Sequence, residues 1–331
     1  MFDVLMRRAG NGDRAAGTGS EPAVEPRPSV ALALGGGAAR GFAHIGVLRT
    51  LVAKGIYPDI IVGTSIGAVA GGCYAGGTLD TLEQWARGLT MRGVLGYLDV
   101  SLSGSGLIGG NRLAQRLDAA LGKTLIEDLP IRFAAIATEV RTGHEIWLTH
   151  GRLVEALRAS YALPGIFPPV RIGGRWLVDG ALVNPVPVSA ARALGARVVV
   201  AVNLNADQFG RGITIVNAGS DNGDEPRVEE PPKPQNRIGA LFSPERALKR
   251  QFLGRAGRPG LSTVMVDAFN VMQDRITRSR LAGDPPDVSI NPRLGQVGWF
   301  DFHRAEEAIR LGSEAAEKAC DTIQEAVAAL A

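Results

Sequence analysis

A serine near the start of the chain stands in a pattern that is typical of hydrolytic nucleophiles. Ser65 is flanked by Gly63 and Thr64 on one side and by Ile66 and Gly67 on the other, directly after a short apolar run. This Gly-x-Ser-x-Gly spacing predicts a nucleophile elbow, in which a sharp turn joins a strand to a helix and exposes the serine hydroxyl. Small neighbours are needed because such a turn strains the backbone and leaves little room for side chains. A small-residue turn with an incidental serine would look the same, so the chemistry depends on partners for the hydroxyl.

A nucleophilic serine requires a site that stabilises the oxyanion of the tetrahedral intermediate, and a run of small residues earlier in the chain could supply it. Residues 35–41 read Gly-Gly-Gly-Ala-Ala-Arg-Gly and follow an apolar run. At the start of a helix, such residues leave backbone N–H groups able to point at a negative charge. The run could also be a dinucleotide-binding turn, which requires an acid near the end of the second strand. Here the second strand ends at Ser65 and Asp59 precedes it, so the oxyanion interpretation is favoured.

A proton acceptor for Ser65 is the third requirement, and histidines are scarce. The chain has four: His44, His144, His150 and His303. A triad in the chain order Ser, acid, His would need His303, which lies beside two phenylalanines where a capping or surface role is expected. Asp179 is the better candidate, because it follows an apolar strand and precedes Gly180, which permits a tight turn. A partly desolvated carboxylate there can accept the serine proton directly. The alternative is that Asp179 is only a turn-forming residue of an Asx turn.

The elements that would carry these residues alternate between strands and helices. Apolar runs at 30–34 and 60–62 are each followed by a glycine-containing turn and a helical pattern. This order predicts a parallel sheet with right-handed crossovers. Further along the chain, a hairpin around Gly173 and Gly174 would deliver Asp179 to the end of its second strand.

Composition divides the chain into four parts. Residues 1–29 are polar and rich in Gly, Ala, Pro and Arg, which predicts a disordered arm. Residues 30–204 are expected to form the α/β domain. Residues 205–236 are rich in Gly, Pro, Asp and Glu and are predicted to be a mobile insertion. Residues 237–331 carry helical patterns and are expected to pack on the domain as a helical C-terminal extension.

Four motifs in this order resemble those of the bacterial patatin-like phospholipases, a family related to plant patatins and to the catalytic domain of neuropathy target esterase. The resemblance covers about residues 30–205. It is carried by the glycine loop with Arg40-Gly41, by Gly63 to Gly67, by Ser160 to Pro169 and by Asp179 to Pro185. It implies a three-layer α/β/α fold with a mainly parallel central sheet, completed by the helical C-terminal part.

The resemblance also implies roles within the site. The family uses a Ser–Asp dyad without histidine, so Ser65 is expected to be the nucleophile and Asp179 the base. Gly180 and Ala181 complete the Asp-Gly-Ala motif. Hydrolysis of lipid acyl esters through an acyl-enzyme is implied, with a phospholipid or lysophospholipid as substrate and with no metal and no cofactor. An acyltransferase with the same dyad and a non-catalytic regulatory protein on the same fold are the alternatives.

The oxyanion motif of the family is Gly-Gly-Gly-x-Arg-Gly. Aligned on Arg40, this chain has Gly36, Gly37 and Ala38 at the three glycine positions. The backbone amides of these three residues are the expected oxyanion donors, and Arg40 either lies near the oxyanion or clamps the loop. Alanine at the third position would strain the loop if a positive φ is required there, but it keeps its amide.

Composition and charge exclude several other classes of protein. The net charge of +3 is too small to argue for nucleic-acid binding, and no nucleic-acid motif is present. Two cysteines, Cys73 and Cys320, do not make a disulfide framework. No apolar run of about 18 residues could span a membrane, and the first residues lack the apolar core of a signal peptide. A cytoplasmic protein is therefore expected.

One segment of the C-terminal part could contact a membrane. Residues Arg237–Arg258 carry six basic side chains, one acidic side chain and several large apolar residues at helical spacing. A basic amphipathic helix of this kind can lie on an anionic lipid surface, which would place the protein at the inner face of the membrane. The alternative is a helix that packs on the domain with its charges in water.

Overall fold

The structure, a computed structural model, describes three stretches of the chain, residues 27–90, 111–207 and 261–331. Most of the expected arm at 1–29 and of the expected insertion at 205–236 lies outside the described residues. The basic segment Arg237–Arg258 lies wholly outside them.

The last residues of the expected arm are described, and they lie against the domain. Arg27 forms an ion pair with Asp59 at 2.7 Å. The Ser29 hydroxyl donates a hydrogen bond to the carbonyl oxygen of Gly195 at 2.9 Å. The ordered domain therefore begins before Val30, because polar side chains attach this end of the chain to two neighbouring loops.

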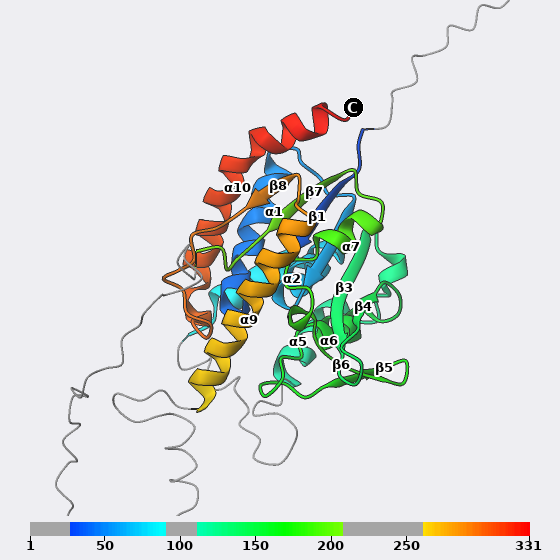
Figure 1. Cartoon of the computed structure of the whole chain (residues 1–331), viewed down its shortest axis with the longest axis vertical. Coiled ribbons are helices and arrows are strands. Elements are labelled where there is room, and N and C mark those ends of the chain that lie inside the picture. Colours follow the sequence, from blue (N-terminus) through cyan, green and yellow to red (C-terminus); the bar gives the residue numbers. More distant parts are fainter. Residues whose placement is uncertain (1–26, 91–110, 208–260) are drawn as a thin grey trace, which may run out of the picture.

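Eight strands of the described chain form one mixed, mainly parallel sheet (Figure 1). They are β1 (Val30–Leu34), β2 (Ile60–Thr64), β3 (Arg132–Glu139), β4 (Glu145–Leu148), β5 (Val170–Ile172), β6 (Arg175–Asp179), β7 (Val198–Val202) and β8 (Val288–Ile290). Their order is β5-β6-β3-β2-β1-β7-β8, and β4 pairs with β3 beside this path. The strands from β8 to β3 run parallel, whereas β4 and β6 run antiparallel to β3. The turns that follow the parallel strands therefore meet at one edge of the sheet.

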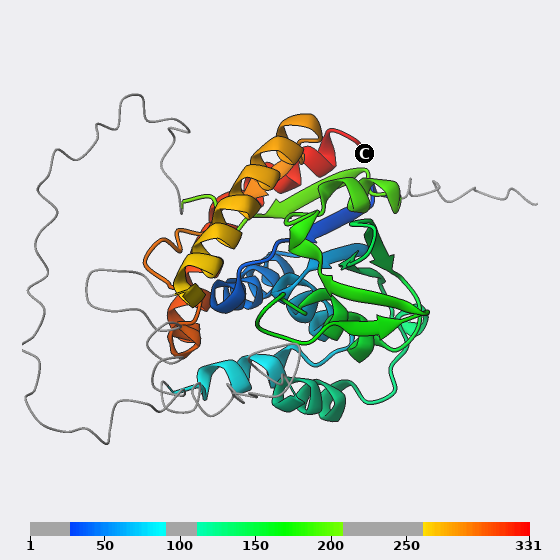
Figure 2. The ribbon, with the colours of Figure 1, turned by 60° about the horizontal axis from the view of Figure 1, so that its bottom comes forward.

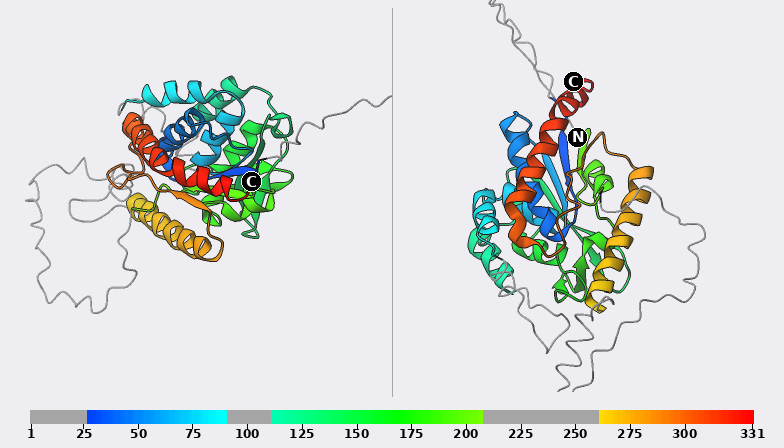
Figure 3. Two further views of the ribbon diagram at one scale, coloured as in Figure 1. Left: turned by 90° about the horizontal axis from the view of Figure 1, so that it is seen from above. Right: turned by 90° about the vertical axis from the view of Figure 1, so that its left-hand side faces the viewer.

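Helices cover both faces of the sheet. The described ones are α1 (Ala43–Ala53), α2 (Ile66–Ala75), α3 (Leu79–Arg87), α5 (Asn111–Leu121), α6 (Leu153–Ser160), α7 (Val188–Ala193), α9 (Leu261–Gly283) and α10 (Ala305–Ala328). Short 3-10 turns are η1 (Ala38–Phe42), η2 (Ile126–Asp128), η3 (Gly180–Leu182) and η4 (Phe302–Arg304). Helices α1 and α10 lie on one face of the sheet, and α9 lies on the other (Figure 3). The predicted three-layer α/β fold is confirmed.

Alternate residues of the buried strands serve the two faces. In β1, Leu32 and Leu34 belong to the core beneath α1, α2 and α10, whereas Ala31 and Ala33 belong to the core beneath α7. All four are 0% exposed. Because each buried leucine contributes about 1.5–3 kcal/mol, the larger core stabilises the sheet that carries the site.

The hairpin of β5 and β6 forms as expected. Gly173 and Gly174 connect the two strands with φ values of 57° and 81°. A two-residue hairpin turn with positive φ at both positions matches the right-handed twist of its strands, which explains the glycine pair. Asp179 is the last residue of β6, so the turn sets where this carboxylate arrives.

The chain after residue 260 completes the fold. β8 pairs with β7 as the edge strand of the described sheet, and α10 packs along α1. Phe269 of α9 packs on Ala181 of η3. Figure 2 shows α9, in gold, on the opposite side of the molecule from α3, in cyan.

Among the described helices, none combines the length and the apolar character needed to cross a membrane.

Candidate active site

Ser65 occupies a strained turn between β2 and α2. Its φ of 57° and ψ of −126° lie outside the regions that residues with side chains ordinarily adopt. A side chain at Gly67 would overlap the carbonyl oxygen of Leu34, so the helix can approach β1 only with glycine there. The Thr64 hydroxyl donates to the carbonyl oxygen of Asn184 at 2.8 Å, which ties the turn to the loop after the Asp-Gly-Ala motif. The predicted elbow geometry is thus present around the serine.

Ser160, the last residue of α6, supports this turn, a role that the sequence analysis did not assign. Its hydroxyl accepts a hydrogen bond from the Ser65 backbone N–H at 2.9 Å and donates one to the Ile136 carbonyl oxygen at 2.6 Å. Ser160 is 0% exposed, so both bonds are shielded from water. The only available signal was its position at the start of the motif that ends at Pro169, and that position said nothing of its contacts.

Sheet register brings Asp179 level with the serine. Thr64, which precedes Ser65, lies opposite Ile136 of β3, and Asp179 lies opposite the next residue, Ala137. The two side chains meet across β3: Ser65 Oγ donates to Asp179 Oδ2 at 2.6 Å. The sequence prediction paired these two residues, and the structure brings them into direct contact.

The environment of the Asp179 carboxylate favours its protonated form. The residue is 2% exposed, and burial raises its pKa from the usual value near 3.8 to about 7. The hydrogen bonds from the Ser65 hydroxyl and from the Ala181 amide, at 2.8 Å to Oδ1, lower the pKa and offset part of this effect. A carboxylate with a pKa near neutrality can both accept and return a proton at physiological pH.

The glycine loop lies next to the serine. A methyl group built on Gly36 would be 3.5 Å from the Ser65 Cβ. However, the Gly36 amide donates to the Pro185 carbonyl oxygen at 3.0 Å, so the expectation that it serves as an oxyanion donor is corrected. The amides of Gly37 and Ala38 make no hydrogen bond within the described residues. Ala38 has a φ of 48°, so the third position of the motif does require the left-handed conformation, at a cost to alanine of about 1–2 kcal/mol.

Arg40 clamps the loop to the C-terminal part of the chain. Its Nε donates to the Val297 carbonyl oxygen at 2.9 Å, and its Nη1 donates to Asn205 Oδ1 at 2.8 Å. Arg40 is 4% exposed. Burial lowers its pKa to about 10, and the charges of Asp207 and Asp301 oppose this shift. Of the two roles that the sequence left open for Arg40, these bonds support the clamp.

Within the described residues, no histidine forms a hydrogen bond with the Ser65 or Asp179 side chain. His44 is fully buried beneath the glycine loop, and its Nε2 lies 2.7 Å from the Gly35 carbonyl oxygen. Burial lowers the pKa of His44 to about 4, so it stays neutral and holds the loop by donating from Nε2. His303 lies in η4, directly before α10.

Apolar side chains pack together where the glycine loop meets the Asp-Gly-Ala motif. One cluster contains Ala38, Leu163, Ala181, Leu182, Val266, Phe269 and Trp299. The rings of Phe269 and Trp299 meet edge to face with centroids 5.6 Å apart. Leu182 also lines a cavity of about 460 Å³ together with Val178 and Phe167. The cluster therefore joins the glycine loop, through Ala38, to the Asp-Gly-Ala motif, through Ala181.

Comparisons with known proteins agree with this geometry. Residues 32–192 match the patatin-like phospholipase family. An uncharacterized NTE family protein of Mycobacterium tuberculosis is 32% identical, over 90% of this chain and 92% of that protein. The chain belongs to the patatin-like phospholipase family. Membership in this family implies lipid acyl hydrolase activity, and the predicted family is confirmed.

Part of the sequence is also similar to longer proteins. A second NTE family protein of Mycobacterium tuberculosis is 28% identical over 88% of this chain, which spans 46% of that protein. Patatin-like phospholipase domain-containing protein 7 of Mus musculus is 35% identical over 54% of this chain, which spans 14% of it. The chain therefore matches only a portion of each of these larger proteins.

Proposed function

We propose that this protein is a serine lipid acyl hydrolase of the phospholipase or lysophospholipase type, with Ser65 as nucleophile and Asp179 as base. The observation that carries the proposal is the 2.6 Å hydrogen bond from Ser65 Oγ to the buried Asp179 Oδ2. Family membership supports the choice of a lipid acyl ester as substrate.

In the acylation step, Ser65 Oγ attacks the ester carbonyl carbon while its proton passes to Asp179 Oδ2. The tetrahedral intermediate collapses with cleavage of the bond to the alcohol oxygen, and protonated Asp179 returns its proton to that leaving alcohol. The hydrogen bond from the Ala181 amide to Oδ1 keeps the carboxylate oriented throughout. A pKa of about 7 suits both transfers, since the group must act first as a base and then as an acid.

In the second half of the reaction, water hydrolyses the acyl-enzyme. The water oxygen attacks the acyl carbon while Asp179 accepts a proton from that water. The ester bond to Ser65 then breaks, and the proton passes to Oγ, which regenerates the hydroxyl and releases the fatty acid.

The oxyanion that forms in both steps needs nearby hydrogen-bond donors. The backbone amides of Gly37 and Ala38 are the proposed donors, because they lie in the loop beside Ser65 and form no hydrogen bond with the part of the chain that the structure describes. Arg40 acts indirectly by fixing the loop through Val297 and Asn205. Loss of one such donor typically slows the reaction about 100- to 1,000-fold.

The acyl chain is proposed to lie against the apolar cluster and the cavity beside Leu182. The sequence of Arg237–Arg258, outside the described residues, supports an additional peripheral contact with anionic lipid. Vesicle co-sedimentation tests that contact: binding should rise with anionic lipid content and fall at high salt.

The test of the function compares wild type with Ser65→Ala on a panel of phospholipids, lysophospholipids and short-chain esters. Wild type should hydrolyse members of the panel and react with a fluorophosphonate, and Ser65→Ala should do neither. Ser279→Ala, which changes an exposed serine on α9, is the matched control and should behave as wild type. Product analysis with an added acceptor alcohol separates hydrolysis from acyl transfer. A wild-type protein that neither turns over any ester nor reacts with the fluorophosphonate would contradict the proposal.

A further inference from the structure

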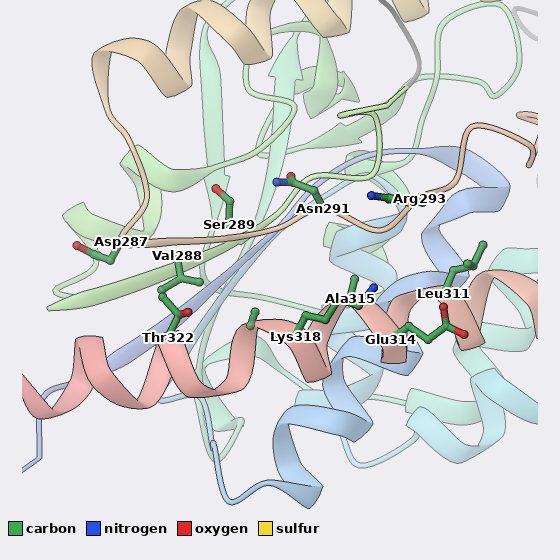
Figure 4. A pocket seen from close by; sticks show the side chains of 11 residues that line it. Asp287, Val288, Ser289, Asn291, Arg293, Leu311, Glu314, Ala315, Lys318 and Thr322 are labelled. Atoms are coloured by element: carbon green, nitrogen blue, oxygen red, sulfur yellow. The ribbon is translucent and has the colours of Figure 1, made fainter.

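A second cavity lies between the edge strand β8 and α10. It has a volume of about 500 Å³, within the range of small-molecule sites. Figure 4 shows the segment from Asp287 to Arg293 on one side of it and α10 on the other. None of the residues that line it belongs to the glycine loop, the apolar cluster or the contact between Ser65 and Asp179. The cavity is therefore distinct from the proposed catalytic centre.

Two acidic side chains line this cavity, and both already have basic partners. Asp287 accepts a hydrogen bond from the Val199 amide at 2.7 Å and pairs with Arg192 at 3.4 Å. Glu314 pairs with Arg310, one turn earlier on α10. Each of these two acids therefore has an arginine partner outside the lining, although Arg192 also pairs with Asp284 at 3.2 Å.

Two basic side chains line the cavity from opposite walls. Arg293 follows β8, and Lys318 lies on α10. Among the described residues, neither forms an ion pair or a side-chain hydrogen bond, and both are exposed. Two positive charges without an ion-pair partner among the described residues therefore border one cavity, which favours an anionic ligand.

The remaining lining indicates what the anion carries. Val288 of β8 is buried, and Leu311, Ala315 and Ala319 of α10 add apolar surface. Such a wall suits a small organic body attached to the charged group. The planar guanidinium of arginine matches the oxygens of a phosphate in a two-bond geometry, and lysine adds a point charge.

We propose that the cavity between β8 and α10 binds a small phosphate-bearing molecule through Arg293 and Lys318. The site goes beyond the proposed lipid hydrolysis and does not depend on it. The phosphate belongs either to a soluble phosphate monoester or to a lipid head group, and the two arms of the experiment separate these sources.

The first arm titrates the full chain carrying Ser65→Ala with glycerol 3-phosphate at low ionic strength, by calorimetry. We expect saturable binding that weakens about 100-fold when Arg293→Gln and Lys318→Gln are added, since each charged hydrogen bond contributes about tenfold. The control adds Lys123→Gln and Arg141→Gln, which remove the same charge from exposed positions outside the cavity and should leave the affinity unchanged. Ala315→Phe, which fills the cavity and keeps both cations, should also abolish binding.

The second arm measures co-sedimentation of the same proteins with vesicles of phosphatidic acid in phosphatidylcholine. A decrease caused by the Arg293→Gln and Lys318→Gln pair, but not by the control pair, with no binding of glycerol 3-phosphate, assigns the site to a lipid head group. The proposal is overturned if neither arm depends on the cavity pair, or if the control pair weakens binding equally. Thermal unfolding without ligand checks that each variant is folded.

Discussion

Replacing Asp179 by asparagine should abolish catalysis and, above neutral pH, stabilise the fold. The amide can keep both hydrogen bonds, because its oxygen can accept from the Ala181 amide and its NH₂ group can donate to the Ser65 hydroxyl. It cannot accept the serine proton, so turnover should fall by several orders of magnitude. It also cannot ionise, so the variant avoids the loss of folding stability that the wild-type protein suffers when the buried Asp179 carboxyl group loses its proton.

The size of that cost follows from the pKa of Asp179. Burial raises the pKa from near 3.8 to about 7, so in the pH range between these values the unfolded chain loses its proton while the folded chain keeps it. The folded state is therefore most favoured below about pH 4, and this stability is lost as the pH rises through about 7. At about 1.4 kcal/mol for each pKa unit, the loss is about 4 kcal/mol near pH 8. The Asp179→Asn variant avoids this loss.

Urea unfolding of wild type and Asp179→Asn, at about pH 4.5 and about pH 8, measures the effect. We expect a variant that is only about 1 kcal/mol more stable at the lower pH, where the unfolded carboxyl has begun to ionise, and about 4 kcal/mol more stable at the higher pH. Asp321→Asn, which changes an exposed carboxylate on α10, controls for the general effect of removing a charge. A stability difference that does not change with pH, or a variant that is less stable near pH 8, would refute the reasoning.

Three further predictions concern the same site. The kcat/KM of the wild-type enzyme should rise about tenfold per pH unit as Asp179 ionises and level off above about pH 7, whereas a plateau that begins below pH 5 would exclude it as the base. Arg40→Met should lower the free energy of unfolding by about 3 kcal/mol, because the buried oxygens of Val297 and Asn205 lose their donor, and should slow fluorophosphonate labelling. His303→Ala should leave turnover unchanged, and a collapse of activity would instead favour a triad.

Much of the site could be predicted from local sequence. The elbow around Ser65 and the glycine loop are strand–turn–helix patterns, and the conformation of such turns is set by residues within a few positions. The same holds for the hairpin that ends at Asp179, since Gly173 and Gly174 select the turn. The strain expected at Ala38 was also a local inference, and its φ of 48° bears it out.

Other features depended on tertiary structure because they join distant parts of the chain. From the sequence alone, the Gly36 amide could be an oxyanion donor. In the structure it instead donates a hydrogen bond to the Pro185 carbonyl oxygen. Arg40 could lie near the oxyanion or hold the loop, and the contacts of its guanidinium with Asn205 and Val297 decided between these roles. No local pattern marks which backbone carbonyl will reach a given donor.

The sequence by itself determined which residues could react, and the tertiary structure decided which of them can react together. Ser65 directly follows β2 and Asp179 ends β6, two strands that do not pair with each other, and both residues reach the same level of the sheet only because each strand pairs in register with β3. The raised pKa of Asp179 likewise results from burial by residues spread along the chain. The physical reason is that turn geometry arises from neighbours in sequence, whereas desolvation and hydrogen-bond partners arise from neighbours in space.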